Sequence, residues 1–313
     1  NYPASSGRAT VNIKSRQYCV PFLAPRPMSM PSLDVVIPVK NRAIADCIAS
    51  LRQLGDRVQT IWLCDGGSTA PDTVTTLAQL ASSATIKILH RPMQAFNKAV
   101  LLNAGIVQSP ADLILVSDAD ILWNAEAIAA LRSTLDRHPQ AICHIADVVE
   151  TRPTNVALTR QRYGYRITQT GGTYQVTLQV VSSRLPQRPG CGLVCARRTT
   201  LLKLRGYKAC FQGWGWEDQD LLMRAQLMDI PVLAAGQVVH QSHPEALRNQ
   251  FYGGLAPTLT RDRNITTCLR SLQQGHLWGD LSPRSSTPQP VPKIQVQWPH
   301  QCCQFPQGSW TFL

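Results

Sequence analysis

Two aspartates separated by a single residue, Asp118 and Asp120, offer the clearest chemistry in the sequence. They follow the apolar run 113–116, which is typical of a buried strand, and side chains two residues apart in an extended segment point to the same face. Two carboxylates held together repel each other unless a cation lies between them. Mg²⁺ and Mn²⁺ prefer oxygen ligands and keep positions open for phosphate and water, so the motif predicts a metal site that binds a diphosphate.

A second segment, residues 213–220, combines glycines, tryptophans and acids. Glycine disfavours a helix and carboxylates resist burial, so the segment is unlike a core element. The flat indoles of Trp214 and Trp216 can lie against the apolar face of a sugar ring, and Glu217 can accept hydrogen bonds from sugar hydroxyls. Asp218, near the N-terminus of a predicted helix, is kept ionised by the helix dipole and can act as a general base. The alternative is an acidic helix cap with aromatic packing.

Two histidines, His240 and His243, follow an apolar strand that begins near Val232. Imidazole is an acceptable ligand for Mn²⁺, so this pair can supply a further metal ligand beside the acidic motifs. The alternative is a pair of structural histidines whose ring nitrogens are hydrogen-bonded within the fold.

Strands and helices alternate before these motifs and must position them. The helix that follows Asn41 is expected to be capped by that residue. Such alternation calls for right-handed crossovers and a mostly parallel sheet of the α/β class, flanked by helices. Ligands of such sheets bind beyond the carboxyl ends of the strands, so we expect the chemistry just after Val39, Cys64 and Ser117. The predicted strands are residues 33–39, 60–64, 86–89 and 113–117, and the predicted helices include Ile44 to Leu51, Val74 to Leu80 and Phe96 to Val107.

From residue 142 onward the alternation loosens. The pattern predicts an isolated strand at 174–181 and helices at 199–204 and 217–227. The stretch from Ser282 to the last residue has six prolines and no helical or strand period, which predicts a poorly ordered tail. The predicted organisation is an irregular arm at 1–32, one α/β domain at 33–245 and a Pro- and Gln-rich, partly disordered extension at 246–313.

The charge distribution is uneven. The chain of 313 residues carries 31 basic and 19 acidic side chains, a net charge of +12. Two stretches hold basic residues and no acid: residues 1–32 with four, and residues 151–209 with eleven. Because the second stretch lies between the two acidic motifs, it predicts an anionic partner near the site. The alternative is a solvated basic face.

Composition excludes several classes of protein. A chain that is 44% hydrophobic and 16% charged is globular rather than disordered or fibrous. No apolar run approaches the roughly 20 residues needed to cross a bilayer, so no transmembrane segment is predicted. The ten cysteines lack the spacing of a disulfide framework or a zinc site, which favours a reducing compartment and a cytoplasmic location.

Six motifs in order give the sequence a family resemblance. It resembles the inverting family 2 glycosyltransferases of the GT-A fold, a Rossmann-like α/β fold. Its later half looks like the C-terminal segment of the β-1,4-galactosyltransferases. The resemblance spans roughly residues 33–245 and is carried by Val36-Ile37-Pro38-Val39-Lys40-Asn41-Arg42, Cys64-Asp65-Gly66-Gly67-Ser68-Thr69, Phe96-Asn97-Lys98-Ala99 with Leu102-Asn103-Ala104-Gly105, Ser117-Asp118-Ala119-Asp120, Gly213 to Asp220, and Val239-His240-Gln241.

The resemblance implies roles for individual residues on the donor side. Asp65 reads the uracil, although the second acid that often follows in the family is Gly66 here. The implied metal ligands are Asp120 and His240, with Mn²⁺ or Mg²⁺ as cofactor and His243 in reserve. The residues implied to bind the donor are Pro38, Asn41, Arg42, Asp65, Lys98, Asn103 and Asp118.

On the acceptor side the resemblance implies Asp218 as the catalytic base. Trp214 and Glu217 are implied to contact the acceptor sugar, and Trp216 belongs to the same expected acceptor surface. The motif residue Val239 replaces the tyrosine usual beside the metal-binding histidine.

The implied function is the metal-dependent transfer of a hexose or N-acetylhexosamine from a UDP-sugar to an acceptor hydroxyl, with inversion. The acceptor is expected to be a saccharide or another hydroxyl compound and to carry, or be presented on, negative charge. Peripheral membrane contact stays open for this reason. Two alternatives are a nucleotidyltransferase, for which the loop after residue 39 lacks glycines, and a basic nucleic-acid-binding module, for which aromatic and basic residues do not interleave. Nucleic acid is therefore not an expected partner.

Overall fold

The computed structural model of the protein describes residues 30–152, 162–181, 188–282 and 291–297, and the statements below concern these residues. The predicted arm, apart from its last three residues, and most of the predicted tail lie outside them. The described residues from Pro31 onward belong to one compact unit.

The first half of the chain forms four parallel strands, in agreement with its alternating pattern. Strand β1 lies between β2 and β4, with Val36 opposite Trp62 on one side and Val116 on the other. Every residue of β1 is buried, as its run of β-branched side chains predicts for a central parallel strand. The strands are β1 (Leu33–Val39), β2 (Thr60–Asp65), β3 (Ile86–His90) and β4 (Leu113–Val116).

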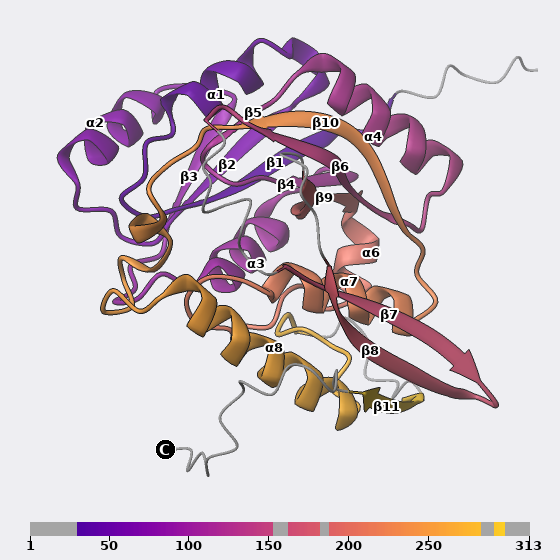
Figure 1. The fold of residues 1–313 in the computed structure, drawn as a ribbon. Helices are drawn as coiled ribbons and strands as arrows, with labels where there is room; N and C mark the ends of the chain where they lie inside the picture. Colours follow the sequence, from indigo (N-terminus) through magenta and orange to yellow (C-terminus); the bar gives the residue numbers. More distant parts are fainter. Residues whose placement is uncertain (1–29, 153–161, 182–187, 283–290, 298–313) are drawn as a thin grey trace, which may run out of the picture. The chain divides into compact units, whose positions relative to one another are not determined.

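Helices cover both faces of the sheet, and the alternation of side chains along β1 decides which residues meet which layer (Figure 1). Val35 and Ile37 pack with α1, α2 and α4, whereas Val36 packs with α3, α6 and α7 on the opposite face. The helices are α1 (Ala45–Arg52), α2 (Pro71–Leu80), α3 (Lys98–Gln108), α4 (Ala125–Arg137), α6 (Arg198–Lys203) and α7 (Glu217–Leu227), with a short 3₁₀ helix η1 (Gly55–Arg57) after α1.

Four later strands extend the sheet to eight, in the order β3-β2-β1-β4-β9-β6-β10-β5. Strand β9 runs antiparallel to β4 and β6, β5 runs antiparallel to β10, and the other neighbours are parallel. The predicted α/β class with a mostly parallel sheet is therefore confirmed. The added strands are β5 (Ile121–Leu122), β6 (Ile142–Glu150), β9 (Arg188–Arg197) and β10 (Val232–His240).

A second, three-stranded sheet lies beside α7 and α8. Strand β8 pairs antiparallel with β7 and parallel with β11, so the strand predicted as isolated at 174–181 is central in a sheet. The third apolar cluster joins this sheet to α7 and α8. The elements are β7 (Arg162–Thr170), β8 (Thr173–Val181), η2 (Glu245–Asn249), α8 (Pro257–Gln273) and β11 (Lys293–Gln297).

The predicted cap of the first helix is wrong. Helix α1 begins at Ala45, and Asn41 lies before it in a left-handed conformation with φ of 49°. The side-chain oxygen of Asn41 accepts hydrogen bonds from the backbone N–H groups of Thr69 (2.6 Å) and Ala70 (2.9 Å). Asn41 therefore fastens the loop after β1 to the loop after β2. Asparagine tolerates this backbone conformation better than most residues.

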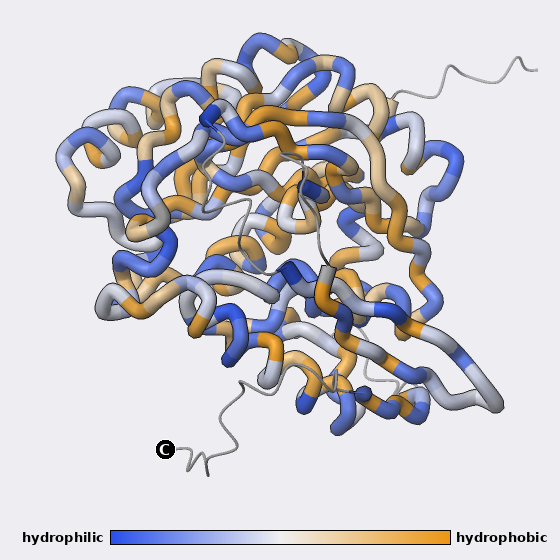
Figure 2. The backbone as a smooth tube through the Cα atoms, viewed as in Figure 1, coloured by the Kyte–Doolittle hydropathy of each residue, from blue (hydrophilic) through white to orange (hydrophobic). Residues whose placement is uncertain are grey.

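Apolar residues are concentrated in the central strands and on the helix faces toward them (Figure 2). Among the described residues, no helix is long and apolar enough to cross a bilayer. The longest described helix, α8, carries buried Ile265, Leu269 and Leu272 on one face and exposed arginines on the other. Its apolar face completes the third cluster.

Candidate active site

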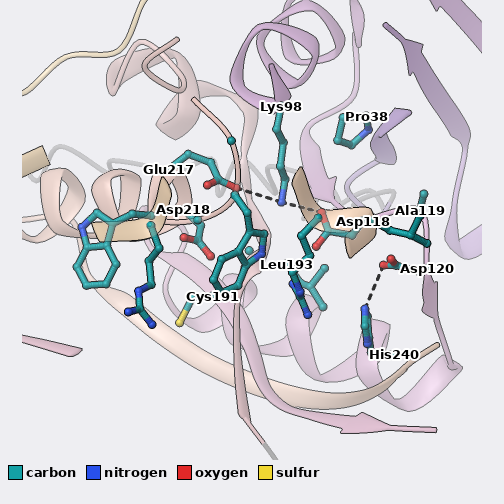
Figure 3. Close-up of a pocket in the computed structure, with 18 of the residues that line it drawn as sticks. Pro38, Lys98, Asp118, Ala119, Asp120, Cys191, Leu193, Glu217, Asp218 and His240 are labelled. Atoms are coloured by element: carbon teal, nitrogen blue, oxygen red, sulfur yellow. Dashed lines mark ion pairs between the residues drawn. The ribbon is translucent and has the colours of Figure 1, made fainter. Parts of the chain in front are cut away.

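One cavity of about 390 Å³ lies beyond the carboxyl ends of β1 and β4. Pro38 and Asp118 line it from these two strands, and β9, the start of α7 and the end of β10 form its other walls (Figure 3). This is the edge of the sheet at which the sequence places the chemistry. The cavity brings together most of the predicted site residues: Pro38, Arg42, Lys98, Asp118, Asp120, Trp214, Trp216, Glu217, Asp218 and His240.

The turn before α7 places Glu217 and Asp218 as the first two residues of the helix. The backbone φ is positive at Gly213, Gly215 and Trp216, and at Trp216 this costs roughly 1–2 kcal/mol because the residue is not glycine. A Cβ at Gly213 would lie 2.7 Å from Thr260 Cγ2 on α8. The glycines therefore serve the turn and its close packing on α8.

This packing corrects the expectation that both indoles are exposed. Trp216 is only 5% exposed and belongs to the third apolar cluster, although it also lines the cavity. Trp214 is partly exposed and presents its ring to the cavity and to Arg248. Of the two tryptophans, Trp214 is thus better placed to meet a sugar ring.

A network of buried charged side chains attaches α7 to the loop that follows α6. Arg224 and Asp220 are both fully buried, and their side chains pair at 2.6 Å. Arg224 also donates to the carbonyls of Leu204 and Gly206, while Lys208 donates to Asp220 at 3.1 Å. Buried charges persist only when fully paired, so this network holds the N-terminal turn of α7 in one position.

Lys98, the first residue of α3, bridges the two sides of the cavity. Its Nζ lies 2.6 Å from Asp118 Oδ1 and 3.5 Å from Glu217 Oε1 (Figure 3). Burial lowers the pKa of Lys98, but Asp118, Glu217 and Asp218 outweigh it and hold the pKa above its ordinary value. Lys98 therefore remains a cation between the end of β4 and the start of α7.

The two acids that begin α7 are harder to ionise than usual. Burial raises the pKa of Glu217 to about 7, with Lys98 lowering it in part and Asp218 raising it further. Burial also raises the pKa of Asp218, whose Oδ1 accepts a 2.7 Å hydrogen bond from the Gln219 N–H. A carboxylate with a raised pKa accepts a proton more readily, which suits a general base.

Gly192 on β9 keeps the space between these acids and Asp118 open. A Cβ at this position would lie 3.2 Å from Asp218 Oδ2, 3.5 Å from Lys98 Nζ and 3.9 Å from Asp118 Oδ2. Asp218 and Asp118 thus approach the same point from α7 and from β4. A reacting group that enters here has a carboxylate on either side.

Asp120 lines the same cavity as Asp118 but has a different set of partners. Its Oδ2 lies 2.7 Å from Arg42 Nη2 and 3.4 Å from His243 Nε2, and its Oδ1 lies 3.5 Å from His240 Nε2. The expectation that Asp118 and Asp120 share one face is wrong, because the chain turns at Ala119 and Asp120 instead of continuing the strand. Asp118 pairs with Lys98, and Asp120 belongs to a separate cluster with the two histidines.

This second cluster fits a divalent cation. Ligand atoms of Asp120, His240 and His243 lie within 4.8 Å of one another. His240 Nδ1 lies 2.6 Å from Glu150 Oε2, and His243 Nδ1 lies 3.0 Å from the Pro244 carbonyl. An ionised carboxylate and a carbonyl can only accept, so both rings carry their proton on Nδ1. When such a ring is neutral, its Nε2 lone pair faces Asp120, an arrangement that a cation between them stabilises.

In the absence of a metal cation, the charges around His240 favour the protonated form of its ring. Burial lowers the pKa of His240, but its contacts with Asp120 and Glu150 raise the pKa to about 9. Burial raises the pKa of Asp120, but His240 and Arg42 outweigh it and hold the pKa far below its ordinary value. A positive charge is thus strongly favoured between Asp120 and His240.

Glu150, at the end of β6, is a site residue that the sequence reasoning missed. Burial raises its pKa, but the hydrogen bond from His240 and the charge of Arg188, whose Nε lies 3.2 Å from Glu150 Oε1, lower the pKa to about 2. Glu150 could be recognised only from the pairing of β6 with β10, because this pairing places Glu150 directly opposite His240. A carboxylate behind a metal-binding histidine orients the ring and increases its basicity.

We expect Glu150→Gln to weaken Mn²⁺ binding about 10- to 100-fold, because the amide keeps the shape but loses the charge behind His240. The measurement is Mn²⁺ titration in the presence of UDP, followed by electron paramagnetic resonance. Asp147→Asn, on the same strand but outside the cavity, serves as the matched control. Equal Mn²⁺ affinities of the wild-type and Glu150→Gln proteins would remove Glu150 from the metal site.

Three predicted donor residues do not line the cavity. Asp65 accepts hydrogen bonds from the N–H and hydroxyl of Ser68, and its Oδ2 lies 2.8 Å from His90 Nδ1. Asn103 is 7% exposed, and its amide group both donates to and accepts from the backbone of Tyr207. The third residue is Asn41, which joins the two loops as described above. Their roles toward the donor stay predictions.

Part of the segment that follows β10 lines the cavity, which the sequence did not indicate. The Tyr252 hydroxyl donates to the Phe96 carbonyl at 2.6 Å, and Lys40 Nζ lies 5.1 Å from the centre of the Phe251 ring. Phe251 also contacts Phe96, with ring centres 6.3 Å apart. These contacts attach the segment to the loops after β1 and before α3.

Comparison with known proteins places the fold and its first half in a known class. The structure has a GT-A-like fold, and residues 34–187 match the model of the family described as glycosyl transferase family 2. Residues 34–187, just under half of the chain, are thus similar to the glycosyltransferases of this family. This match favours sugar transfer over the nucleotidyltransferase and nucleic-acid-binding alternatives. None of the curated proteins that were compared matches the chain.

Solved structures with a similar fold are distant in sequence. The mannosyltransferase PcManGT from Pyrobaculum calidifontis, in complex with GDP-Man and Mn²⁺, superposes with a TM-score of 0.51 at 17% identity over 80% of this chain and 66% of its own. GalNAc-T7 with UDP, GalNAc and Mn²⁺ gives a TM-score of 0.53 at 14% identity. The match covers 78% of this chain and 48% of GalNAc-T7. TarS from S. aureus gives a TM-score of 0.50 at 15% identity. The match covers 80% of this chain and 40% of TarS. The chain thus spans about two thirds of the length of these proteins or less.

Proposed function

We propose that the protein is a metal-dependent inverting glycosyltransferase that moves a hexose or N-acetylhexosamine from a UDP-sugar to an acceptor hydroxyl. The observation that carries the proposal is the arrangement of the cavity. The Asp120 cluster stands on one side, Asp218 stands on the other, and the open space at Gly192 lies beside Asp218. The family 2 match over residues 34–187 supports the class of reaction.

Asp120, His240 and His243 are the residues that would hold Mn²⁺ or Mg²⁺. When bound, the metal neutralises the charge that develops on the leaving diphosphate. Arg42 adds fixed positive charge beside Asp120, and Lys98 adds it between Asp118 and Glu217; such preorganised charge stabilises the transition state without rearrangement. These residues therefore bind the donor and stabilise its departing nucleotide.

Asp218 is the proposed base on the opposite side. It removes the proton of the acceptor hydroxyl while the hydroxyl oxygen bonds to the anomeric carbon of the sugar, and the bond from that carbon to the diphosphate breaks. The proton remains on a carboxyl oxygen of Asp218, and the electron pair leaves with UDP. A single displacement of this kind inverts the anomeric carbon.

Donor identity is open to a direct test. UDP-galactose, UDP-N-acetylgalactosamine, UDP-glucose and GDP-mannose are incubated with the protein and Mn²⁺, and nucleotide release and products are followed by mass spectrometry. GDP-mannose belongs in the panel because one structural neighbour binds GDP-Man and another binds UDP. We expect release of UDP from at least one UDP-sugar. Release from GDP-mannose alone would contradict the proposed donor class.

We also propose a reducing, cytoplasmic environment for the protein. The seven described cysteines are free thiols, and most of them are buried. Burial raises the pKa of Cys47 and of Cys64 to about 12, so neither thiol is reactive at neutral pH. These side chains behave as small apolar core residues.

A further inference from the structure

Gly192 lies in the interior of β9, where a glycine weakens a strand and often marks the close approach of a ligand. Its backbone does not require a glycine, because its φ lies outside the left-handed region. Packing in the core does not require one either. A Cβ at Gly190, two residues earlier, would lie 2.9 Å from Ile145 Cβ, but the three atoms nearest to a Cβ at Gly192 are charged ends of side chains that line the cavity. Gly192 therefore leaves free space in the cavity and not in the core.

Three charged groups from three different elements surround this space. A Cβ at Gly192 would lie 3.2 Å from Asp218 Oδ2 and 3.5 Å from Lys98 Nζ, and the third group, Asp118 Oδ2, would lie at 3.9 Å. Figure 3 shows Lys98 reaching between Asp118 and Glu217. A ligand atom keeps a van der Waals distance from the Cα of Gly192, so it lies beyond the position of this Cβ, among the three groups. The space therefore joins the proposed base on α7 to the ammonium group on α3.

A hydroxyl group suits both of these neighbours. It has one hydrogen to donate, which the Asp218 carboxylate accepts, and its lone pairs can accept a hydrogen bond from an ammonium group. Lys98 has three N–H donors, so beside its ion pairs with Asp118 and Glu217 it can donate to a further oxygen. A carboxylate in this space would be repelled by Asp218 and Asp118, and an apolar group would leave the charges without hydrogen bonds.

We propose that the acceptor hydroxyl that receives the sugar binds in the space beside Gly192, donates its proton to Asp218 and accepts a hydrogen bond from Lys98. Lys98 is then a catalytic residue on the acceptor side as well as a donor-binding residue. As the proton passes to Asp218, negative charge develops on the attacking oxygen, and the ammonium group stabilises it. Lys98 keeps its own protons, because the neighbouring carboxylates hold its pKa above the ordinary value. This inference rests on the proposed function, since it names the residues that hold the nucleophile of the same reaction.

The first variant, Gly192→Ala, fills the space with a single methyl group. We expect UDP release from the preferred UDP-sugar to fall by about 100-fold, the cost of misplacing a reacting group by about 1 Å. Water is the acceptor when no other is added, so UDP release can be measured before the natural acceptor is known. The affinity for UDP in the presence of Mn²⁺, measured by calorimetry, should stay the same. The melting temperature should not fall, because alanine restricts the unfolded chain more than glycine does.

Gly190→Ala is the contrasting variant in the same strand. Its methyl group would meet Ile145 Cβ and Val148 Cγ2 at 2.9 Å, so we expect a lower melting temperature. If Gly192→Ala also lowered the melting temperature, and UDP release fell only in proportion to the folded fraction, Gly192 would be a packing glycine and the inference would be overturned.

The second variant, Lys98→Met, removes the ammonium group and keeps the length of the side chain. If Lys98 holds the attacking oxygen, kcat for UDP release falls about tenfold or more, and the KM of the UDP-sugar changes less. Loss of a donor contact alone would instead raise KM and leave kcat unchanged. Lys98→Arg keeps the charge and should recover part of kcat. Lys203→Met, at an exposed lysine on α6 outside the cavity, is the matched control.

The wild-type assay separates this inference from the proposed function. If the wild-type protein with Mn²⁺ releases UDP from no UDP-sugar, the proposed function fails. If the wild-type protein releases UDP and either Gly192→Ala or Lys98→Met has the same kcat, the proposed function stands and the inference is overturned. A loss confined to KM in Lys98→Met also overturns it. Loss of kcat in both variants, with UDP affinity retained in Gly192→Ala, supports a hydroxyl held between Asp218 and Lys98.

Discussion

Asp218→Asn is expected to lower the rate of sugar transfer by about 10²- to 10⁴-fold, the usual contribution of a general base. Asparagine has the same shape but cannot take the proton of the acceptor hydroxyl. UDP binding should stay within about twofold, because the metal cluster and Lys98 are unchanged. The measurement is single-turnover transfer together with UDP calorimetry.

The wild-type protein provides a pH control for this prediction. Because burial raises the pKa of Asp218, the base is ionised only above that raised pKa, so transfer should increase with pH and then level off. The residual rate of Asp218→Asn should lack this rise. Asp136→Asn, an exposed acid on α4, should behave as the wild type. Unchanged turnover in Asp218→Asn would remove Asp218 from the mechanism.

Removal of the metal is expected to abolish transfer and to weaken UDP binding, because the leaving diphosphate then meets no divalent cation. Chelation by EDTA tests this for the whole site, with recovery on addition of Mn²⁺. His240→Ala should reduce Mn²⁺ affinity more than His243→Ala does. His240 is buried and oriented by Glu150, whereas His243 is partly exposed and oriented only by a backbone carbonyl.

The two histidine variants are compared by Mn²⁺ titration, so the result does not depend on activity. His138→Ala, an exposed histidine at the end of α4, is the matched control. Transfer that survives exhaustive chelation would refute metal dependence. A larger loss in His243→Ala than in His240→Ala would reverse the assignment of the principal imidazole ligand.

The sequence predicted the elements whose pattern is local. The β-branched run of β1 and the amphipathic helix α7, Glu217–Leu227, appear in the structure with the predicted bounds. In both cases the burial of each side chain follows from its own periodicity. The pairing of strands does not follow from local periodicity. For this reason β8 was predicted as an isolated strand, although β7 and β11 flank it.

The site shows the same division. Residues within a motif, such as Asp118 and Asp218, could be named from the sequence, because their types and spacing indicate chemistry. Glu150 and Arg248 could not, because each enters the cavity only through contacts with residues distant in the chain. Trp216 was misjudged for a similar reason, since α8 covers it and no local pattern announces that covering helix.

The third apolar cluster joins residues that are synthesised far apart in time. The apolar face of α7 belongs to the same cluster as Ile265, Leu269 and Ile294, all of which are synthesised after Asp120, His240 and His243. The residues of the proposed metal site are therefore synthesised before the residues that complete the packing of α7, the helix that carries the proposed base. We therefore expect a chain that ends after residue 256 to have lost sugar transfer, because α7 then lacks the residues of α8 and β11 that share its apolar cluster.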